Sequence, residues 1–278
     1  MTTLTLGTAQ WGTPYGITNT VGRLSDEAIA DIVSVAHEWD VTRIDTACGY
    51  GDAQTRLAPV ARDFLVTTKV AGAGDVPAQL LTALRELSID SVESVLVHDW
   101  DALSGEQRLS TVRSLGRAVD AGQVRHVGVS VYDESGVNSA IDVFASRGCP
   151  LGAIQIPANV LDRRLDDSTV LSDLAATGAD IVVRSAFLQG LLVTEGGGRA
   201  DHPDVAAFRT WAREHSVTPV AACLAHVRAL PWAAQVVVGV TSAHELSEIC
   251  EAWASVPPAL ADPDLASTDP DLIDPRRW

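Results

Sequence analysis

Lysine is almost absent from this chain of 278 residues, in which Lys69 is the one lysine among 20 basic side chains. Acidic residues number 36, so the formal net charge is −16 at pH 7. No basic run is longer than an Arg-Arg pair, and the chain therefore lacks the phosphate-neutralising surface that nucleic-acid binding needs. The same charge disfavours anionic membranes. We expect neither a nucleic acid nor a membrane as a partner.

Paired cysteines and long apolar runs are missing as well. The four cysteines are scattered without a Cys-x-x-Cys spacing, which argues against a disulfide framework and a zinc ribbon. No apolar run reaches the roughly 20 residues of a membrane helix. The N-terminal residues lack the basic and apolar regions of a signal peptide, so we expect a cytoplasmic protein. No metal site is predicted, because His98, Asp99 and Asp101 lie too close along the chain to face one point.

Short apolar segments alternate with segments of helical periodicity. After Ser25, a typical capping residue, Ile29 and Val33 fall on one face of a predicted helix. The alternation indicates βαβ units and a parallel sheet. Eight strands in one domain-sized chain favour an α/β fold of the (β/α)8 TIM-barrel type. The predicted strands are Leu4–Thr8, Arg43–Ala47, Phe64–Val70, Ser94–His98, His126–Val131, Ala153–Ile156, Ile181–Ser185 and Val236–Val240.

The barrel is expected to occupy residues 1–255, followed by a different segment at 256–278. This segment holds five prolines and five aspartates and has no helical period. We predict an extended, Pro/Asp-rich C-terminal tail. Its last residues, Arg276, Arg277 and Trp278, either fold back over a cleft or extend into solvent.

A glycine-rich turn follows the third predicted strand. Gly72 and Gly74 match the start of a dinucleotide-binding loop, but Pro77 stands where that loop needs a third small residue. We therefore predict an ordinary loop and a helix that begins near Pro77.

Polar side chains follow several strands at the end where barrel enzymes hold their catalytic groups. Asp45 ends the second strand and Tyr50 follows it, while Lys69 and His98 end the third and fourth. An ammonium beside a phenol lowers its pKa from about 10. Asp45 would keep that ammonium charged, and His98 would orient a carbonyl oxygen. Together the four groups form a site that protonates an alkoxide as a hydride reaches carbon.

Each of these residues also has a structural alternative. Asp45 could cap a turn, Tyr50 could be an exposed loop aromatic, and His98 could be a hydrogen-bonded histidine at the rim. Lys69 is harder to explain in this way, since the chain uses arginine for every other cation. A compact ammonium is a tunable point charge, which a guanidinium is not.

The segment from Asp45 to Gly51, Asp-Thr-Ala-Cys-Gly-Tyr-Gly, resembles the Asp-Thr-Ala-x-x-Tyr-Gly motif of the aldo-keto reductase superfamily. The similarity extends from Leu6 to the eighth strand. It implies that Asp45, Tyr50, Lys69 and His98 form a catalytic tetrad with Tyr50 as general acid. It also implies an extended nicotinamide cofactor, NADPH or NADH, bound without a Rossmann fold, and a small carbonyl substrate.

The resemblance also places cofactor-binding residues along the strand ends. They are Gly7, Thr8, Ser130, Gln155, Arg184, Ser185, Gly239, Thr241 and Glu245. Val131 replaces an asparagine of the family, and Arg184 replaces an aromatic that stacks on nicotinamide. Thr241 or Glu245 stands where a cation usually binds the 2′-phosphate, and Ile249 where an asparagine binds adenine. A carboxylate there would repel a 2′-phosphate and accept bonds from ribose hydroxyls, so we expect weakened NADPH preference.

The substrate is less well defined by the sequence. Trp11 and Trp100 are expected to line the mouth of the site, and an arginine of the rim could recognise an anion. Two other functions stay open: a cofactor-binding sensor or interaction protein with little turnover, and a lyase that uses Lys69 as a Schiff-base nucleophile.

Overall fold

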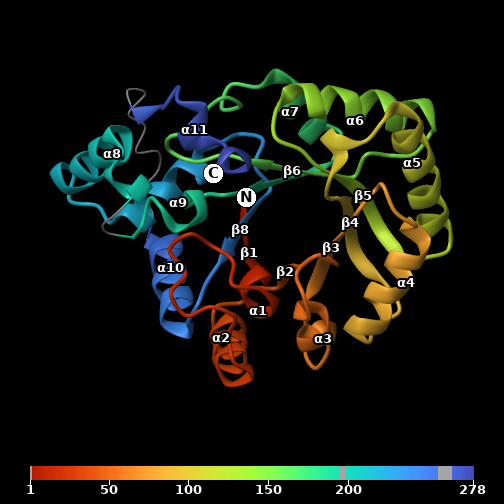
Figure 1. Cartoon of the computed structure of the whole chain (residues 1–278), viewed down its shortest axis with the longest axis horizontal. Helices are drawn as coiled ribbons and strands as arrows, with labels where there is room; N and C mark the ends of the chain where they lie inside the picture. Colours follow the sequence, from red (N-terminus) through yellow and green to blue (C-terminus); the bar gives the residue numbers. More distant parts are fainter. Residues whose placement is uncertain (1, 195–197, 256–264) are drawn as a thin grey trace.

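The computed structural model describes residues 2–194, 198–255 and 265–278. Eight parallel strands pair in chain order, and β1 also pairs with β8, which closes the sheet into a barrel (Figure 1). The strands are β1 (Thr3–Gly7), β2 (Arg43–Asp45), β3 (Leu65–Val70), β4 (Val92–Val97), β5 (Val124–Ser130), β6 (Ala153–Pro157), β7 (Asp180–Arg184) and β8 (Gln235–Gly239). The predicted (β/α)8 barrel is confirmed, and each predicted strand is present with ends that differ by at most two residues.

Helices alternate with the strands and surround the barrel (Figure 1). They are α1 (Ala9–Gly12), α2 (Asp26–Glu38), α3 (Ala53–Leu57), α4 (Val76–Leu87), α5 (Gly105–Asp120), α6 (Glu134–Ser146), α7 (Thr169–Ala176), α8 (Pro203–Glu214), α9 (Pro219–Ala229), α10 (Ala243–Ser255) and α11 (Pro270–Ile273). The Ser25 side chain accepts a hydrogen bond from the Ala28 amide and so caps α2 as predicted. Asp75 caps α4, whose first turn contains Pro77, and this confirms an ordinary loop after β3.

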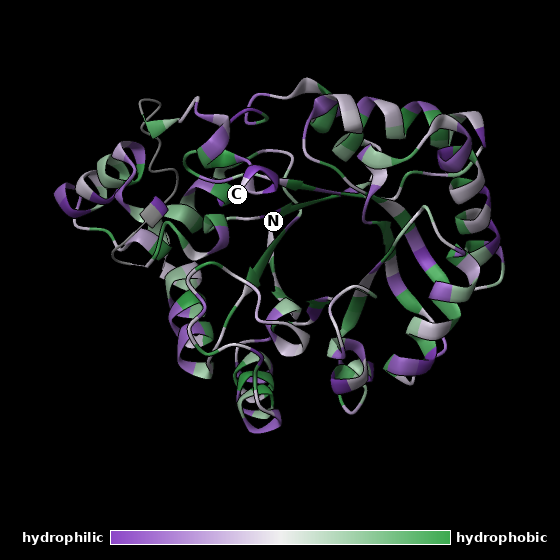
Figure 2. Ribbon diagram, in the orientation of Figure 1, coloured by the Kyte–Doolittle hydropathy of each residue, from purple (hydrophilic) through white to green (hydrophobic). Residues whose placement is uncertain are grey.

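Apolar side chains gather between the strands and the helices, and Figure 2 shows hydrophobic strands at the centre with hydrophilic residues on the outer helices. A second buried cluster lies beside this core. It is built by residues such as Leu161, Leu188 and Phe208, and it includes Leu272 and Ile273 of the C-terminal segment. Burial of these two side chains holds the end of the chain against the barrel.

Within residues 265–278, the predicted extended tail contains two short helical segments. They are α11 and a 3₁₀ helix, Pro275–Arg277, each with a proline in the first turn. Asp269 and Asp274 cap these turns through their side chains, which gives regular structure to a segment without helical periodicity. The rest of the predicted tail, residues 256–264, lies outside the described residues. In the described ranges, no helix combines the length and apolar character needed to cross a membrane.

Candidate active site

Asp45 and Lys69 form a buried ion pair at the carboxyl ends of β2 and β3. Both side chains are almost completely buried, and the Lys69 ammonium donates a hydrogen bond to Asp45 and another, of 3.1 Å, to the Thr46 carbonyl. Burial, the largest single influence, would lower the pKa of Lys69, but the Asp45 carboxylate and the Tyr50 phenol together outweigh it and the pKa is raised. Lys69 is therefore a charged ammonium at neutral pH. The other Asp45 oxygen, Oδ2, accepts a 2.8 Å hydrogen bond from Gln155 on β6.

Tyr50 completes this arrangement from the loop between β2 and α3. Its phenol oxygen lies 3.4 Å from Lys69 Nζ. The loop can take this position because Gly12, at the end of α1, packs directly against it. A Cβ on Gly12 would lie 1.8 Å from the Tyr50 carbonyl oxygen, so only glycine fits there. The close approach of the two backbones holds the phenol beside the ammonium.

His98 follows β4 and stands with the edge of its ring toward Tyr50, the two ring centroids being 5.9 Å apart. Partial burial lowers the pKa of His98 to about 4, and the positive charge of Lys69 acts in the same direction. The imidazole is therefore neutral at pH 7 and has one N–H to donate. The four residues predicted as a tetrad thus lie together at one rim of the barrel.

This low pKa predicts the NMR titration of His98. Since the pKa lies near 4, protonation occurs only in acid, and the ring-proton shifts should stay constant from about pH 8 down to about pH 5.5, where an ordinary histidine with a pKa of about 6.5 has already titrated. A spectrum of His98→Gln assigns the resonance. A midpoint above about pH 6 would contradict the arrangement.

A cavity of about 500 Å³ opens beside the tetrad. Tyr50 and Asp45 line it at one end, and the segment after β8 lines it at the other. Five residues predicted to bind the cofactor between these ends also line it: Gly7, Thr8, Gln155, Ser185 and Gly239. Ser130 is buried next to Gln155 in the strand register but does not line the cavity.

Gln10 is an unexpected feature of the cavity wall. Its side chain is buried, and Oε1 has no hydrogen-bond partner among the described residues. The amide packs against Gly239, where a Cβ would lie 2.6 Å from Gln10 Nε2. A buried amide without a partner is costly, so a ligand hydroxyl or amide at this place would be stabilised.

The far end of the cavity is acidic. Glu245 accepts hydrogen bonds from the Thr241 amide (2.6 Å) and hydroxyl (2.9 Å), which holds its carboxylate at the start of α10. Glu248 and Ile249 line the same end. The predicted Thr241 and Glu245 are thus brought together, and Glu248 adds a second carboxylate that the sequence reasoning did not single out.

Arg184 ends β7 and lines the cavity near the tetrad. Its guanidinium carbon lies 4.1 Å from the centroid of the Tyr132 ring. The placement is consistent with the prediction that Arg184 reaches the cavity, and one face of its guanidinium packs on Tyr132. The neighbouring Ser185 has a φ of 61°, a left-handed conformation that turns the chain sharply after the strand.

We expected Trp11 and Trp100 to line the mouth of the site, but they do not. Both indoles are completely buried in the main core and are absent from the cavity wall. Trp100 packs against Phe144 of α6, with ring centroids 6.0 Å apart. Their positions after β1 and β4 suggested exposure, but their large apolar rings gain more from burial between strand and helix.

All three tyrosines lie at the site, whereas the sequence analysis singled out Tyr50 alone. The chain has three tyrosines. Tyr15 and Tyr50 line the cavity, and Tyr132 stacks on Arg184 of its wall. The rarity of the residue, together with positions shortly after β1, β2 and β5, is the signal that would have found Tyr15 and Tyr132.

Comparison with known proteins agrees with this geometry. The Aldo/keto reductase family profile matches residues 3–259, so the chain belongs to the aldo/keto reductase family. An aldo-keto reductase of Mycobacterium marinum is 32% identical over 137 residues, which are 44% of this chain and 47% of that protein. The alignment therefore spans about half the length of this relative.

Solved structures share the fold at lower identity. A thermostable aldo-keto reductase in complex with the inhibitor epalrestat is 21% identical, with a TM-score of 0.71 over 94% of this chain and 92% of the other. A glycerol dehydrogenase from Gluconobacter oxydans is 18% identical, with a TM-score of 0.68 over 94% of each chain. At these identities the likeness concerns the barrel alone.

Proposed function

We propose that this protein is a nicotinamide-dependent carbonyl reductase, acting on a small aldehyde or ketone or, in reverse, on the corresponding alcohol or lactol. The observation that supports it best is the phenol of Tyr50, which lines the cavity and is held 3.4 Å from the ammonium of the buried Lys69. A positioned acid next to a fixed cation is what carbonyl reduction requires.

The cavity wall fits a dinucleotide. Gln10 offers an unpartnered amide oxygen, and Glu245 offers a carboxylate that would accept hydrogen bonds from ribose hydroxyls. Gly7, Thr8, Gln155, Ser185 and Thr241 would complete the contacts along the cavity. When bound, the nicotinamide supplies a hydride.

The residues of the chain supply the proton and its control. Tyr50 donates the phenolic proton to the carbonyl oxygen as that oxygen becomes an alkoxide. Lys69 stabilises the negative charge left on the phenol oxygen, and Asp45 keeps the ammonium charged and fixed in place. The neutral His98 donates its N–H toward the substrate oxygen and orients it.

The same contacts weigh against a lyase. A Schiff base requires a neutral amine, whereas Asp45 raises the pKa of Lys69 and keeps it protonated. Absorbance of reduced nicotinamide, followed with a panel of aldehydes and ketones, tests the proposal directly. Tight cofactor binding without turnover of any carbonyl would indicate a sensor instead, and borohydride trapping of a substrate on Lys69 would indicate a lyase.

Glu245 sets the cofactor preference that we expect. The two carboxylates at the far end of the cavity repel a 2′-phosphate, so NADH should bind at least as tightly as NADPH. Glu245→Arg should tighten NADPH binding by about tenfold relative to NADH, because a close charge pair replaces a repulsion. Fluorescence titration of both cofactors measures the ratio.

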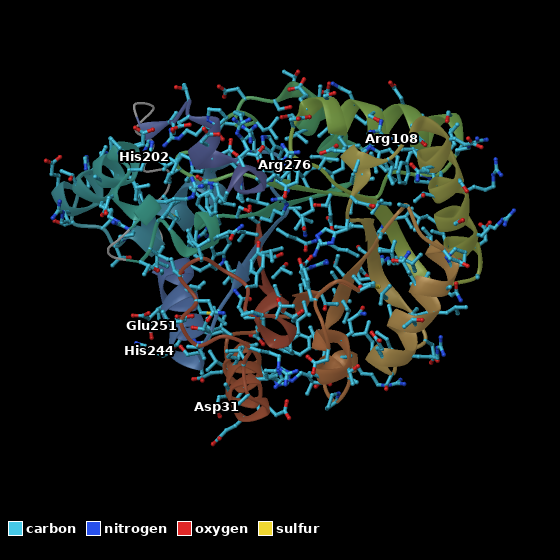
Figure 3. The ribbon with its side chains drawn as sticks, viewed as in Figure 1. Asp31, Arg108, His202, His244, Glu251 and Arg276 are labelled. Atoms are coloured by element: carbon cyan, nitrogen blue, oxygen red, sulfur yellow. The ribbon has the colours of Figure 1, made fainter. Side chains whose placement is uncertain are left out.

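The control for this substitution lies on the same helix. Glu251→Arg makes the same charge change on the exposed side of α10, outside the cavity wall (Figure 3), and should leave the ratio unchanged. Wild-type protein that binds NADPH tenfold more tightly than NADH would refute the assignment of Glu245.

A further inference from the structure

Arg184 is the one lysine or arginine among the residues that line the described cavity. Three carboxylates, those of Asp45, Glu245 and Glu248, line it as well. In a chain with a net charge of −16, a cation at this position is a marked departure from the surrounding charge. Asp45 is neutralised by its ion pair with Lys69, and Glu245 and Glu248 belong to the far end, so Arg184 makes the end near Tyr50 locally positive.

The guanidinium of Arg184 has no counter-charge among the described residues. Within residues 2–194, 198–255 and 265–278, no carboxylate lies within 4.0 Å of its guanidinium. Among the described residues, the group makes two long hydrogen bonds, to the Val131 carbonyl (3.3 Å) and the Ser185 hydroxyl (3.4 Å). A half-buried guanidinium without a counter-charge is unfavourable, and an anion in the cavity would offset that cost.

Arg184 is also held in a fixed orientation. Its guanidinium stacks on the Tyr132 ring, and Arg276 of the C-terminal segment stacks on the same ring at 3.8 Å. Figure 3 shows Arg276 near the middle of the molecule, where this segment reaches the barrel. The charge of Arg276 is balanced by Asp274, which it contacts at 2.6 Å, and it lies 4.0 Å from Asp101. Arg276 therefore supports Tyr132, while the N–H groups of Arg184 that do not bond Val131 or Ser185 are left for a ligand.

Arg184 lies close enough to the tetrad to contact a substrate bound there. After burial and the charge of Lys69, the positive charge of Arg184 also acts to lower the pKa of His98, so the guanidinium is within electrostatic reach of the tetrad. It also acts on Tyr15, which lines the same cavity.

From this geometry we infer that the carbonyl substrate carries an anionic group, a carboxylate or a phosphate, which Arg184 binds while Tyr50 protonates the carbonyl oxygen. The inference rests on the proposed reductase function and narrows its substrate to aldehyde or keto acids and their phosphate analogues. A planar guanidinium with several free N–H groups matches both anions.

Paired aldehydes that differ only in the anion test this directly. One pair is 4-carboxybenzaldehyde and methyl 4-formylbenzoate, and the other is glyceraldehyde 3-phosphate and glyceraldehyde. For each pair the ratio of kcat/KM, anionic over neutral, is measured in the wild type and in Arg184→Met. Loss of a charge-assisted contact should lower the ratio by at least about tenfold in one pair or both. The pair that falls more identifies the anion, since the intrinsic reactivities of the aldehydes cancel between the two proteins.

Arg125→Met is the matched control. Arg125 lies at the opposite, amino-terminal end of β5, its side chain is 71% exposed, and its loss changes the net charge by the same amount. It should leave both ratios unchanged. An equal fall in Arg125→Met would mean that overall charge, not a contact, sets the preference, and would overturn the inference.

Two further results separate this inference from its alternatives. Unchanged ratios in Arg184→Met would overturn it while leaving the reductase function intact, whereas no nicotinamide oxidation with any aldehyde in any protein would refute the function itself. Cofactor Kd is measured in parallel by fluorescence. A rise in Kd with an equal loss of kcat/KM for both members of each pair would assign Arg184 to the cofactor instead of the substrate.

Discussion

Tyr50→Phe is expected to lower kcat by about 10²- to 10⁴-fold, the range associated with a positioned general acid. Tyr50 lines the cavity, and its phenol oxygen lies 3.4 Å from Lys69 Nζ. Phenylalanine keeps the ring while removing the proton donor. Cofactor Kd should stay within about twofold of the wild-type value, since no cofactor contact of the phenol is part of the mechanism. Stopped-flow absorbance of reduced nicotinamide and fluorescence titration measure the two quantities.

Tyr15→Phe provides the comparison within the same cavity. It also removes a phenol hydroxyl from the wall, but the Tyr15 hydroxyl makes no hydrogen bond to Lys69 or to another described residue. Its effect on kcat should be far smaller than that of Tyr50→Phe. If Tyr15→Phe abolished turnover and Tyr50→Phe retained it, the general acid would have been assigned to the wrong tyrosine.

Lys69→Met is expected to have the largest combined effect, on both activity and stability. It removes the cation beside the phenol and leaves the Asp45 carboxylate buried without its counter-charge. Breaking a buried pair in this way costs about 3–5 kcal/mol of unfolding free energy. Turnover should fall at least as far as in Tyr50→Phe. Urea denaturation and single-turnover kinetics measure the two losses.

A second pair of variants separates stability from catalysis at this position. Asp45→Asn combined with Lys69→Met removes both charges and should recover at least about half of the lost stability without recovering activity. Lys69→Arg keeps the formal charge, but its larger planar group does not fit the fully buried space beside Asp45 and Tyr50, so turnover should still collapse. Normal activity in Lys69→Arg would show that any cation suffices.

The sequence predicted the barrel accurately because barrel strands leave a local pattern. In β7 and β8, Ile181–Val183 and Val236–Val238 are largely buried between the barrel interior and the helices, so they are short apolar runs bounded by polar residues or glycine. The helical turns of the C-terminal segment were not predicted, because this segment leaves no local pattern. Residues 265–278 have no periodicity, and their structure depends on Leu272 and Ile273 meeting a cluster formed by distant parts of the chain.

The site divides in the same way. Side chains at the strand ends could be listed from the sequence, since a parallel barrel brings those ends to one rim. The sequence could not show which of these side chains face the cavity. Trp11 and Trp100 are examples, because both are completely buried. Contacts such as Gln155 with Asp45, across 110 positions, and Arg276 with Tyr132 join strands and loops that no local pattern connects.

The sequence by itself determined the alternation of strands and helices and the family resemblance, and it singled out its one lysine as a candidate site residue. These features follow from periodicity, a short motif and the rarity of a residue, all of which are properties of neighbours along the chain. Only the tertiary structure decided that Tyr132 and the C-terminal segment hold Arg184. It also decided that, among the described residues, Arg184 has no counter-charge and the buried Gln10 amide oxygen has no partner. Charge balance and burial depend on what lies nearby in space, and closure of the barrel sets those neighbours.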